Sequence, residues 1–342
     1  MRKFTTKLLL CCLLVCSLFV SQPETAKADT INGIQPILPV QYQKLLGKGM
    51  DVDWSKTKKG QETFHKTIVK DFKNAGINHV RIRVKDNVSQ DLFYHLDEQI
   101  RACLEAGIIP IIAYQANGFK NSASDEDMDK VVEWWSAVAE HYKNESYLLS
   151  FDMMIECTDA LNKQPDKLNE LYEKVVTAIR QTNPTRILMM SPRVRSDAQY
   201  LSELKVPTQA NGYMMAEWHF YASGPSKENE RKLWTTGTEK EKNLIRNKIQ
   251  LALEWQKKTG IPTWVGAWMA GNYNDGDDYS VKEQVIFAHF MVSELKKAGI
   301  PFAVNADTHF YDRENKTWIK NAAIALLHFF FLWTGCESFV YR

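Results

Sequence analysis

The sequence predicts a single-domain (β/α)8 barrel of the TIM type, within the α/β class. From about residue 45 onward, eight short apolar runs alternate with long amphipathic segments, and no low-complexity linker separates them. Apolar runs of this kind are typical of strands buried on both faces, and their alternation with helices indicates a parallel sheet. Eight such units in roughly 300 residues is the number that closes a (β/α)8 barrel.

The eight predicted strands are spread along the chain. In order, they are residues 48–54, 79–84, 108–115, 148–156, 186–192, 212–221, 262–268 and 301–307. A doubly wound open sheet is the alternative. It needs a glycine loop for a nucleotide after the first strand, and the stretch GKGMDVDW lacks the G-x-G-x-x-G pattern. The closed barrel is therefore the prediction.

Amphipathic segments between these runs are predicted to be helices. They include residues 61–76, 92–107, 127–142, 166–182, 241–260 and 281–299. Glycine tolerates the positive φ that is common just past a helix C-terminus. Four of the segments stop at such a residue: Gly76, Gly107, Gly260 and Gly299.

The first 28 residues are predicted to be a signal peptide. Arg2, Lys3 and Lys7 precede the apolar run LLLCCLLVCSLFV, and AKA ending at Ala28 fits an A-x-A cleavage site. The run is too short to span a bilayer. We therefore expect export, cleavage near Ala28, and a secreted barrel of residues 29–342, extracellular or periplasmic, with no membrane span.

Charge and cysteine content exclude several classes of protein. Residues 1–28 carry four Lys or Arg and one Glu, so without them the formal charge falls from +2 to −1. A near-neutral chain gives no electrostatic case for nucleic acid as a partner. Only Cys103, Cys157 and Cys336 remain after cleavage, which argues against a disulfide framework. We expect a monomer without metal or cofactor.

Polar side chains gather at the predicted strand ends, where a barrel of this type carries its active site. A dense, convergent polar set at one rim indicates a binding site rather than isolated structural groups. In chain order, the set is Asp51, Asp53, Arg81, Arg83, Gln115, Glu156, Arg193, Glu217, His219, Tyr221, Trp268, Asn305 and Asp307.

Five stretches in order resemble a cellulase of glycoside hydrolase family 5. They are AGINHVRIRV, SFDMMIECTDALN, IRQTNPTRILMM, WHFYASGP and GIPTWVGAWMAG. The resemblance implies a polysaccharide substrate, similar to a β-glucan. It also implies that Glu156 is the catalytic acid/base, with Arg81, His219 and Tyr221 beside it.

The same resemblance exposes departures at positions that carry chemistry. The family's nucleophilic Glu on strand seven corresponds to Ala267, and the Asn before the acid/base corresponds to Ile155. The strand-three His is replaced within AYQANG, and the strand-eight Trp by Asn305 or Ala306. A retaining glycosidase needs two carboxyls, one as acid/base and one as nucleophile. Alanine cannot be the second.

A relocated second carboxylate is therefore expected if the protein is an enzyme. Glu217 is the first candidate, since alternation along a strand places it on the same face as His219 and Tyr221. The others are Asp53, Asp159 and Asp307. An inverting reaction with a wider carboxyl separation is a second possibility. A catalytically inactive pseudo-glycosidase that binds glycan is the alternative function.

Two further expectations concern the chemistry of the site. Ile155 beside Glu156 is expected to raise the pKa of that carboxyl and keep it protonated near neutrality. Tryptophan rings offer apolar faces on which pyranose rings stack. The candidates for such stacking, together with Tyr221, are Trp54, Trp218, Trp234 and Trp268.

Overall fold

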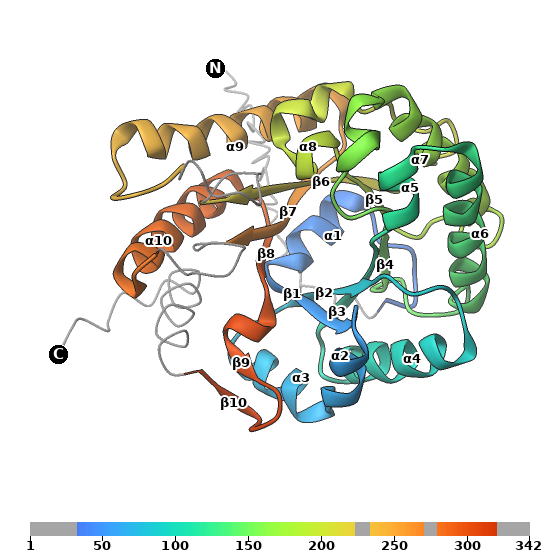
Figure 1. The fold of residues 1–342 in the computed structure, drawn as a ribbon, viewed down its shortest axis with the longest axis horizontal. Helices are drawn as coiled ribbons and strands as arrows, with labels where there is room; N and C mark the ends of the chain where they lie inside the picture. The colour runs from blue at the N-terminus through green and yellow to red at the C-terminus, as the bar shows by residue number, and fades with distance from the viewer. Residues whose placement is uncertain (1–32, 223–232, 270–278, 320–342) are drawn as a thin grey trace, which may run out of the picture. The chain divides into compact units, whose positions relative to one another are not determined.

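The computed structural model describes residues 33–222, 233–269 and 279–319. The signal peptide predicted for residues 1–28 lies outside them. All eight predicted strands are present, and they close into one barrel in chain order (Figure 1). The strands are β1 (Lys48–Ser55), β2 (His79–Val84), β3 (Ile109–Tyr114), β4 (Ser150–Asp152), β5 (Leu188–Met190), β6 (Met214–Tyr221), β7 (Thr263–Met269) and β8 (Phe302–Asn305).

Every neighbouring pair of barrel strands is parallel, and β8 pairs with β1 to complete the ring. The predicted single-domain (β/α)8 barrel is therefore confirmed. A small antiparallel pair, β9 (Tyr311–Asp312) and β10 (Thr317–Trp318), follows the barrel.

The longer helices lie around the outside of the ring of strands, whereas the short helix α1 is drawn within the ring (Figure 1). The longer ones match the predicted segments, and three short helices were not foreseen: α1, α5 and α8. In chain order, the helices are α1 (Pro39–Leu46), α2 (Lys58–Thr63), α3 (Lys66–Asn74), α4 (Gln90–Glu105), α5 (Asn117–Ser122), α6 (Asp125–His141), α7 (Pro165–Arg180), α8 (Arg193–Ser196), α9 (Glu239–Thr259) and α10 (Val281–Ala298), with single 3-10 turns η1 (Asp159–Lys163), η2 (Ala198–Glu203) and η3 (Asp307–His309).

The helix predicted for residues 61–76 is in fact two helices, α2 and α3. Phe64 between them adopts an extended backbone, and Nδ1 of His65 accepts a hydrogen bond from the amide of Ile68 across 3.2 Å. His65 therefore caps the second helix. A side chain that competes for helical amides in this way starts a new helix instead of continuing the old one.

Strand β7 contains an irregularity that decides where its side chains point. Trp218 pairs with Val265 and His219 pairs with Ala267, so Gly266 is an extra residue on β7. A bulge of this kind re-aims the side chains that follow it. Ala267 lies opposite His219 and packs with Tyr221, where it is fully buried.

Candidate active site

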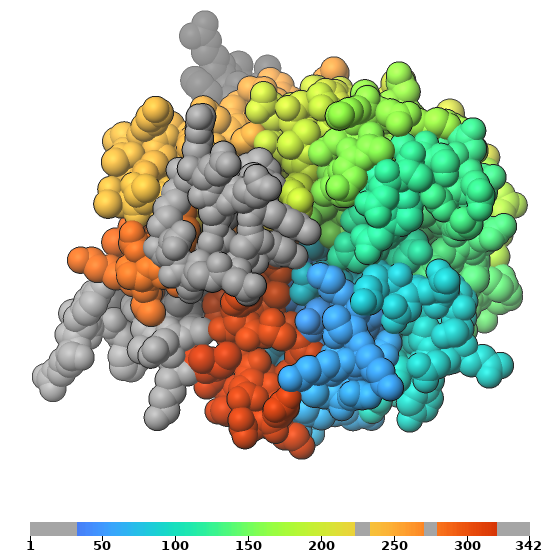
Figure 2. Space-filling model, in the orientation of Figure 1, coloured from blue at the N-terminus to red at the C-terminus, as the bar shows by residue number. Residues whose placement is uncertain are grey.

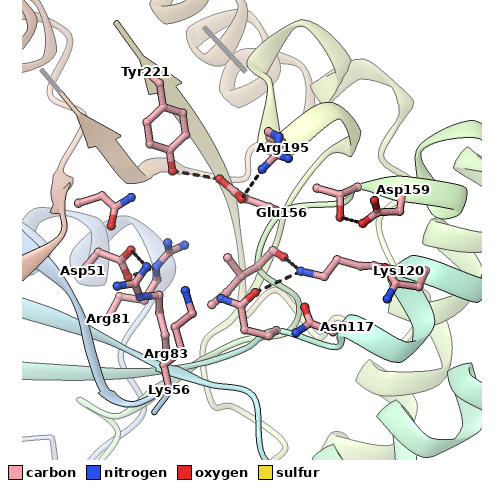
Figure 3. Close-up of a pocket in the computed structure, with 15 residues that line it drawn as sticks. Asp51, Lys56, Arg81, Arg83, Asn117, Lys120, Glu156, Asp159, Arg195 and Tyr221 are labelled. Atoms are coloured by element: carbon pink, nitrogen blue, oxygen red, sulfur yellow. Dashed lines mark hydrogen bonds and ion pairs between the residues drawn. The ribbon is translucent and has the colours of Figure 1, made fainter. Parts of the chain in front are cut away.

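A cavity of about 460 Å³ opens at the carboxyl ends of the barrel strands. Seven residues of the predicted polar set line it: Asp51, Arg81, Arg83, Gln115, Glu156, Tyr221 and Asn305. The remaining described lining residues are Lys56, Asn117, Lys120, Asn121, Ile155, Thr158, Asp159 and Arg195. Figure 3 shows these side chains converging on the cavity from several strand ends. On the face seen in Figure 2, the blue β1–α2 region lies beside the red segment after β8.

Glu156 lies at the wall of the cavity and accepts hydrogen bonds from three directions. Nδ1 of His219 and the hydroxyl of Tyr221 each lie 3.0 Å from Oε1, and Nη1 of Arg195 lies 3.5 Å from Oε2. Figure 3 shows Tyr221 and Arg195 meeting this carboxylate. The side chain is 16% exposed, so a ligand in the cavity can reach it.

The expected upward shift of the Glu156 pKa is wrong. Burial does raise the pKa, but the hydrogen bond from His219 and the charges of His219 and Arg195 outweigh burial and hold the pKa well below its ordinary range. Ile155 lines the cavity next to it but does not decide the shift. Glu156 is therefore an ionised carboxylate at neutral pH.

His219 is buried between two carboxylates. Its Nε2 lies 2.6 Å from Oε1 of Glu217, while its Nδ1 faces Glu156. Burial lowers the pKa of His219, but the charge of Glu217 and the hydrogen bonds of both carboxylates raise it to about 9. The imidazole is therefore protonated at neutral pH and donates on both sides.

Arg81 is the centre of a buried ion network beneath the cavity. Its Nε donates to Asp51 across 2.9 Å, and its Nη1 contacts Asp152 at 3.3 Å and also binds Glu217. Burial and the charge of Glu217 raise the pKa of Asp152 well above its ordinary value, against the opposing charge of Arg81. Arg83 also approaches Asp51, at 3.5 Å.

Glu217, the first candidate for the second carboxylate, does not line the cavity. It shares the inward face with His219, as alternation predicts, but it is fully buried and bound to Arg81. Arg193, another member of the predicted polar set, pairs with Glu203 instead. Because Glu217 is buried behind the imidazole of His219, it cannot contact a sugar in the cavity.

Asp53 and Asp307 do not line this cavity either, although both were expected in the site. Arg313 pairs with each of them, and Asp307 accepts a further hydrogen bond from Nε1 of Trp54 at 3.1 Å. Asp53 and Arg313 line a different cavity, beside α2 and β9. Burial raises the pKa of Asp307 to about 6, with the charge of Arg313 opposing.

Among the described residues, Asp159 is the one carboxylate candidate that shares the cavity with Glu156 and has no cation partner. It is exposed at the start of η1 and accepts a hydrogen bond from the hydroxyl of Thr158 across 2.6 Å. Asp51 also lines the cavity, but Arg81 and Arg83 hold both of its oxygens.

The tryptophans proposed for sugar stacking are core residues. Trp268, Trp54, Trp218 and Trp234 are each at most 1% exposed, and none lines the cavity. The ring of Trp268 packs on Phe287 and Phe302, outside the barrel strands. The alternation that turns His219 inward turns Trp218 outward, so aromatic composition alone does not reveal a stacking platform.

Several cavity residues lie outside the predicted strands and were not among the predicted site residues. Lys120 comes from the short helix α5, Lys56 follows β1, and Arg195 lies in α8. Arg195 stands where Arg193 was expected, because residues 194–196 have φ between 56° and 61°. Nothing in a strand pattern signals such a turn. Ala116 (φ 47°) and Glu156 (φ 51°) share this left-handed conformation.

The described ranges offer neither a metal-binding cluster nor a membrane-spanning helix. No group of three or more His, Cys, Asp or Glu side chains there could hold a metal ion. No helix in those ranges is long and apolar enough to cross a membrane. Cys103 and Cys157 are buried and unpaired.

Two curated relatives share low identity with this chain. Endoglucanase H of Acetivibrio thermocellus is 21% identical over 272 residues, 75% of this chain and 30% of that protein. A β-xylosidase of Phanerodontia chrysosporium is 21% identical over 221 residues, 57% of this chain and 45% of that protein. The chain thus spans less than half the length of either relative.

Solved structures share the fold. Endoglucanase Cel5A from Thermotoga maritima superposes with a TM-score of 0.74 at 22% identity, covering 85% of this chain and 100% of that one. The clostridial cellulose synthase subunit Z from Clostridioides difficile gives 0.71 at 19% identity, covering 82% and 99%. The cellulase family itself matches residues 40–306. With its closed barrel and this match, the chain belongs to glycosyl hydrolase family 5, the cellulase family.

Proposed function

We propose that the cavity around Glu156 binds a segment of polysaccharide and that it does so without double-displacement hydrolysis. The observation that carries this proposal is Glu156 at the wall of an open cavity, held by Tyr221 and by the buried His219 behind it. Ala267, which corresponds by the sequence resemblance to the family's nucleophile, supports the absence of double displacement. Cel5A, which shares the fold, has been crystallised with cellobiose and with mannotriose.

The cavity is lined for hydrogen bonding to hydroxyl groups. Gln115, Asn117, Asn121, Thr158 and Asn305 supply neutral donors and acceptors. Oδ1 of Asn305 is buried and has no hydrogen-bond partner within the described chain. A buried acceptor that faces a cavity needs a donor, and a sugar hydroxyl provides one.

Double displacement fails on both of its chemical requirements. It needs a second carboxyl about 5 to 5.5 Å from the first, and Ala267 offers a methyl group. It also needs a protonated acid, whereas Glu156 is held ionised. Both requirements depend on position 267, because a carboxylate there would also raise the pKa of Glu156 by like-charge repulsion. Without that carboxylate, burial alone does not offset the lowering of the Glu156 pKa by His219 and Arg195.

Single-displacement hydrolysis is the second candidate function, and Asp159 favours it. Inverting glycosidases place their two carboxyls about 6.5 to 9.5 Å apart and activate water between them. Asp159 and Glu156 line one cavity, and Asp159 has no ion pair within the described residues. In this scheme one carboxylate activates water, and the other takes up a proton when substrate binds.

The test measures binding and turnover separately. Neutral β-glucan, xylan and mannan oligosaccharides are titrated calorimetrically, and reducing ends are counted over long incubations. The variants are Glu156→Gln and Asp159→Asn. Binding without new reducing ends in any protein supports the glycan-binding function. Turnover lost in both variants supports the inverting enzyme, and the absence of binding to any glycan contradicts both.

Secretion is part of the proposal and rests on residues 1–28 alone. The basic start, the apolar run and the A-x-A site before Asp29 support it. Mass spectrometry of the protein recovered from culture supernatant tests it, with an N-terminus at Asp29 as the expected result. A cell-associated chain that keeps residues 1–28 contradicts it.

A further inference from the structure

The cavity around Glu156 carries more cationic than anionic side chains. Within the described residues, five cations line it: Lys56, Arg81, Arg83, Lys120 and Arg195. Three carboxylates line it: Asp51, Glu156 and Asp159. The excess is local, because the whole sequence carries a formal charge of only +2 over 342 residues.

Two of the three carboxylates are already matched to cations, and the third, Asp159, is exposed and has no ion pair within the described residues. Asp51 is held by Arg81 and Arg83. Glu156 pairs with Arg195 and with the protonated His219. After these pairs, Lys56 and Lys120 remain against the single exposed carboxylate of Asp159, so the two lysines are the source of the surplus positive charge.

Lys120 is a buried cation whose partners are neutral. It is 4% exposed, and its Nζ donates to the carbonyl of Ile155 at 2.9 Å and to Oε1 of Gln115 at 3.2 Å. No carboxylate of the described chain forms an ion pair with it. Buried charges are ordinarily paired, so this arrangement leaves room for an anion supplied from outside.

Lys56 faces the same cavity from the opposite side. Figure 3 shows it reaching in beside Arg83 and Asp51, while Lys120 enters from α5. Lys56 also forms no ion pair with a carboxylate in the described part of the chain. Burial lowers the pKa of both lysines, that of Lys120 to about 8, and for Lys56 the charge of Arg83 adds to the effect. A bound anion would relieve both.

The cavity lining also contains few of the aromatic faces on which neutral sugar rings stack. Tyr221 is the one aromatic side chain among the described lining residues, and the tryptophans near the barrel are in the core. Pyranose rings without charge gain much of their affinity from aromatic faces. Recognition in this cavity therefore depends on charge and hydrogen bonds.

On the proposed glycan-binding function, we propose that the cavity selects a saccharide that carries an anionic group, either a uronate carboxylate or a phosphate ester. Lys56 and Lys120 are the residues that pair with this group, and Glu156, already neutralised by His219, lies beside the sugar ring. A charge-assisted hydrogen bond to each lysine distinguishes such a ligand from a neutral glycan of the same shape.

The experiment compares ligands that differ only in charge. The full chain is titrated calorimetrically with a hexuronic acid oligosaccharide, with the same oligosaccharide after reduction of its carboxyls to hydroxymethyl groups, and with a sugar phosphate and its dephosphorylated form. We expect one charged member to bind at least about tenfold more tightly than its neutral partner. The preference should shrink as salt is raised.

Substitution of each lysine tests whether Lys56 and Lys120 cause the tighter binding of charged ligands. Lys56→Gln is expected to reduce the ratio of charged to neutral affinity about tenfold, and Lys120→Gln to do the same if it folds. Lys130→Gln, an exposed lysine of α6 that pairs with Glu126 and Asp127, is the matched control and should keep the ratio. Circular dichroism checks folding. Lys56 is not deeply buried, so its variant alone keeps the test decisive.

The outcomes separate this inference from the function on which it rests. Equal affinity for charged and neutral partners, or an unchanged ratio in folded Lys56→Gln, overturns the anionic-ligand inference and leaves glycan binding standing. No binding to any saccharide overturns the proposed function instead. Whether the uronate or the phosphate member shows the preference identifies the source of the anion.

Discussion

A β-carbon placed on Gly266 would lie 1.8 Å from Oε1 of Glu217. The carboxylate that serves His219 and Arg81 therefore occupies the space that a side chain on the β7 bulge would need. This contact explains why the residue before Ala267 has no side chain. It also ties the buried charge network to β7, the strand that carries Ala267.

Gly266→Ala is accordingly expected to destabilise the barrel. Forcing a methyl group against a buried carboxylate shifts it from Arg81 and His219, at a cost of about 1 to 3 kcal/mol in the free energy of unfolding. Urea denaturation measures the loss. Gly118→Ala in α5, where a β-carbon meets nothing closer than 3.5 Å, is the control and should be neutral or slightly stabilising. Equal stability of the two variants would contradict the contact.

Ala267→Glu is expected to create or raise hydrolytic activity, with retention of anomeric configuration. The bulge turns position 267 inward beside Tyr221, and a second carboxylate there supplies a nucleophile and raises the pKa of Glu156. Reducing-end release should rise at least about tenfold, equivalent to roughly 1.4 kcal/mol of transition-state stabilisation. Proton NMR of the products reports the anomer. Ala267→Gln has the same size without the charge and should stay inactive; activity in it would refute this explanation.

Arg81→Lys should lower both stability and glycan affinity. Lysine lacks the planar fork that holds Asp51, Asp152 and Glu217 together, and removing one partner of a buried charge network costs roughly 3 to 5 kcal/mol. Glycan affinity should fall at least about tenfold. Arg193→Lys, at a partly exposed pair with Glu203, should change stability by under about 1 kcal/mol. A folded Arg81→Lys protein with unchanged stability would argue against the network.

Stability should decline on the alkaline side because of His219. Its pKa is about 9 in the folded protein and 6.5 for an unperturbed imidazole. A raised pKa contributes stability that is fully present below pH 6.5 and is lost as the pH rises through about 9. The contribution is on the order of 3 kcal/mol, at 1.36 kcal/mol for each unit. Unfolding free energies at pH 6 and pH 9.5 measure it, and His219→Gln should flatten this difference.

The fold was predictable because it rests on regular patterns. Eight apolar runs and the helices between them fix a (β/α)8 barrel whatever the loops do, and all four glycines past helix ends, such as Gly260 and Gly299, do have positive φ. The break at Phe64 was missed because His65 is an uncommon cap, invisible to an amphipathic pattern that continues across it.

The site was only partly predictable. Strand alternation correctly placed Glu217 on the same face as His219, but it cannot tell how deep a side chain lies, and Glu217 is beneath the imidazole. Pairing with Arg313 removed Asp53 and Asp307 from the site, and that arginine comes from a segment after the last barrel strand. Lys120 and Arg195 reach the cavity through a short helix and a left-handed turn, for which a single sequence carries no clear signal.

The left-handed residues around the cavity place backbone strain at its rim. Ala116, Glu156 and Arg195 follow three successive strands, and each holds a conformation that costs a non-glycine residue roughly 1 to 2 kcal/mol. Strain of this kind persists only where the surrounding structure over-determines it, and it clusters at active sites and ligand clamps. The strained rim is therefore a second reason, independent of the lining charges, to propose that this cavity holds a ligand, whatever chemistry Ala267 permits.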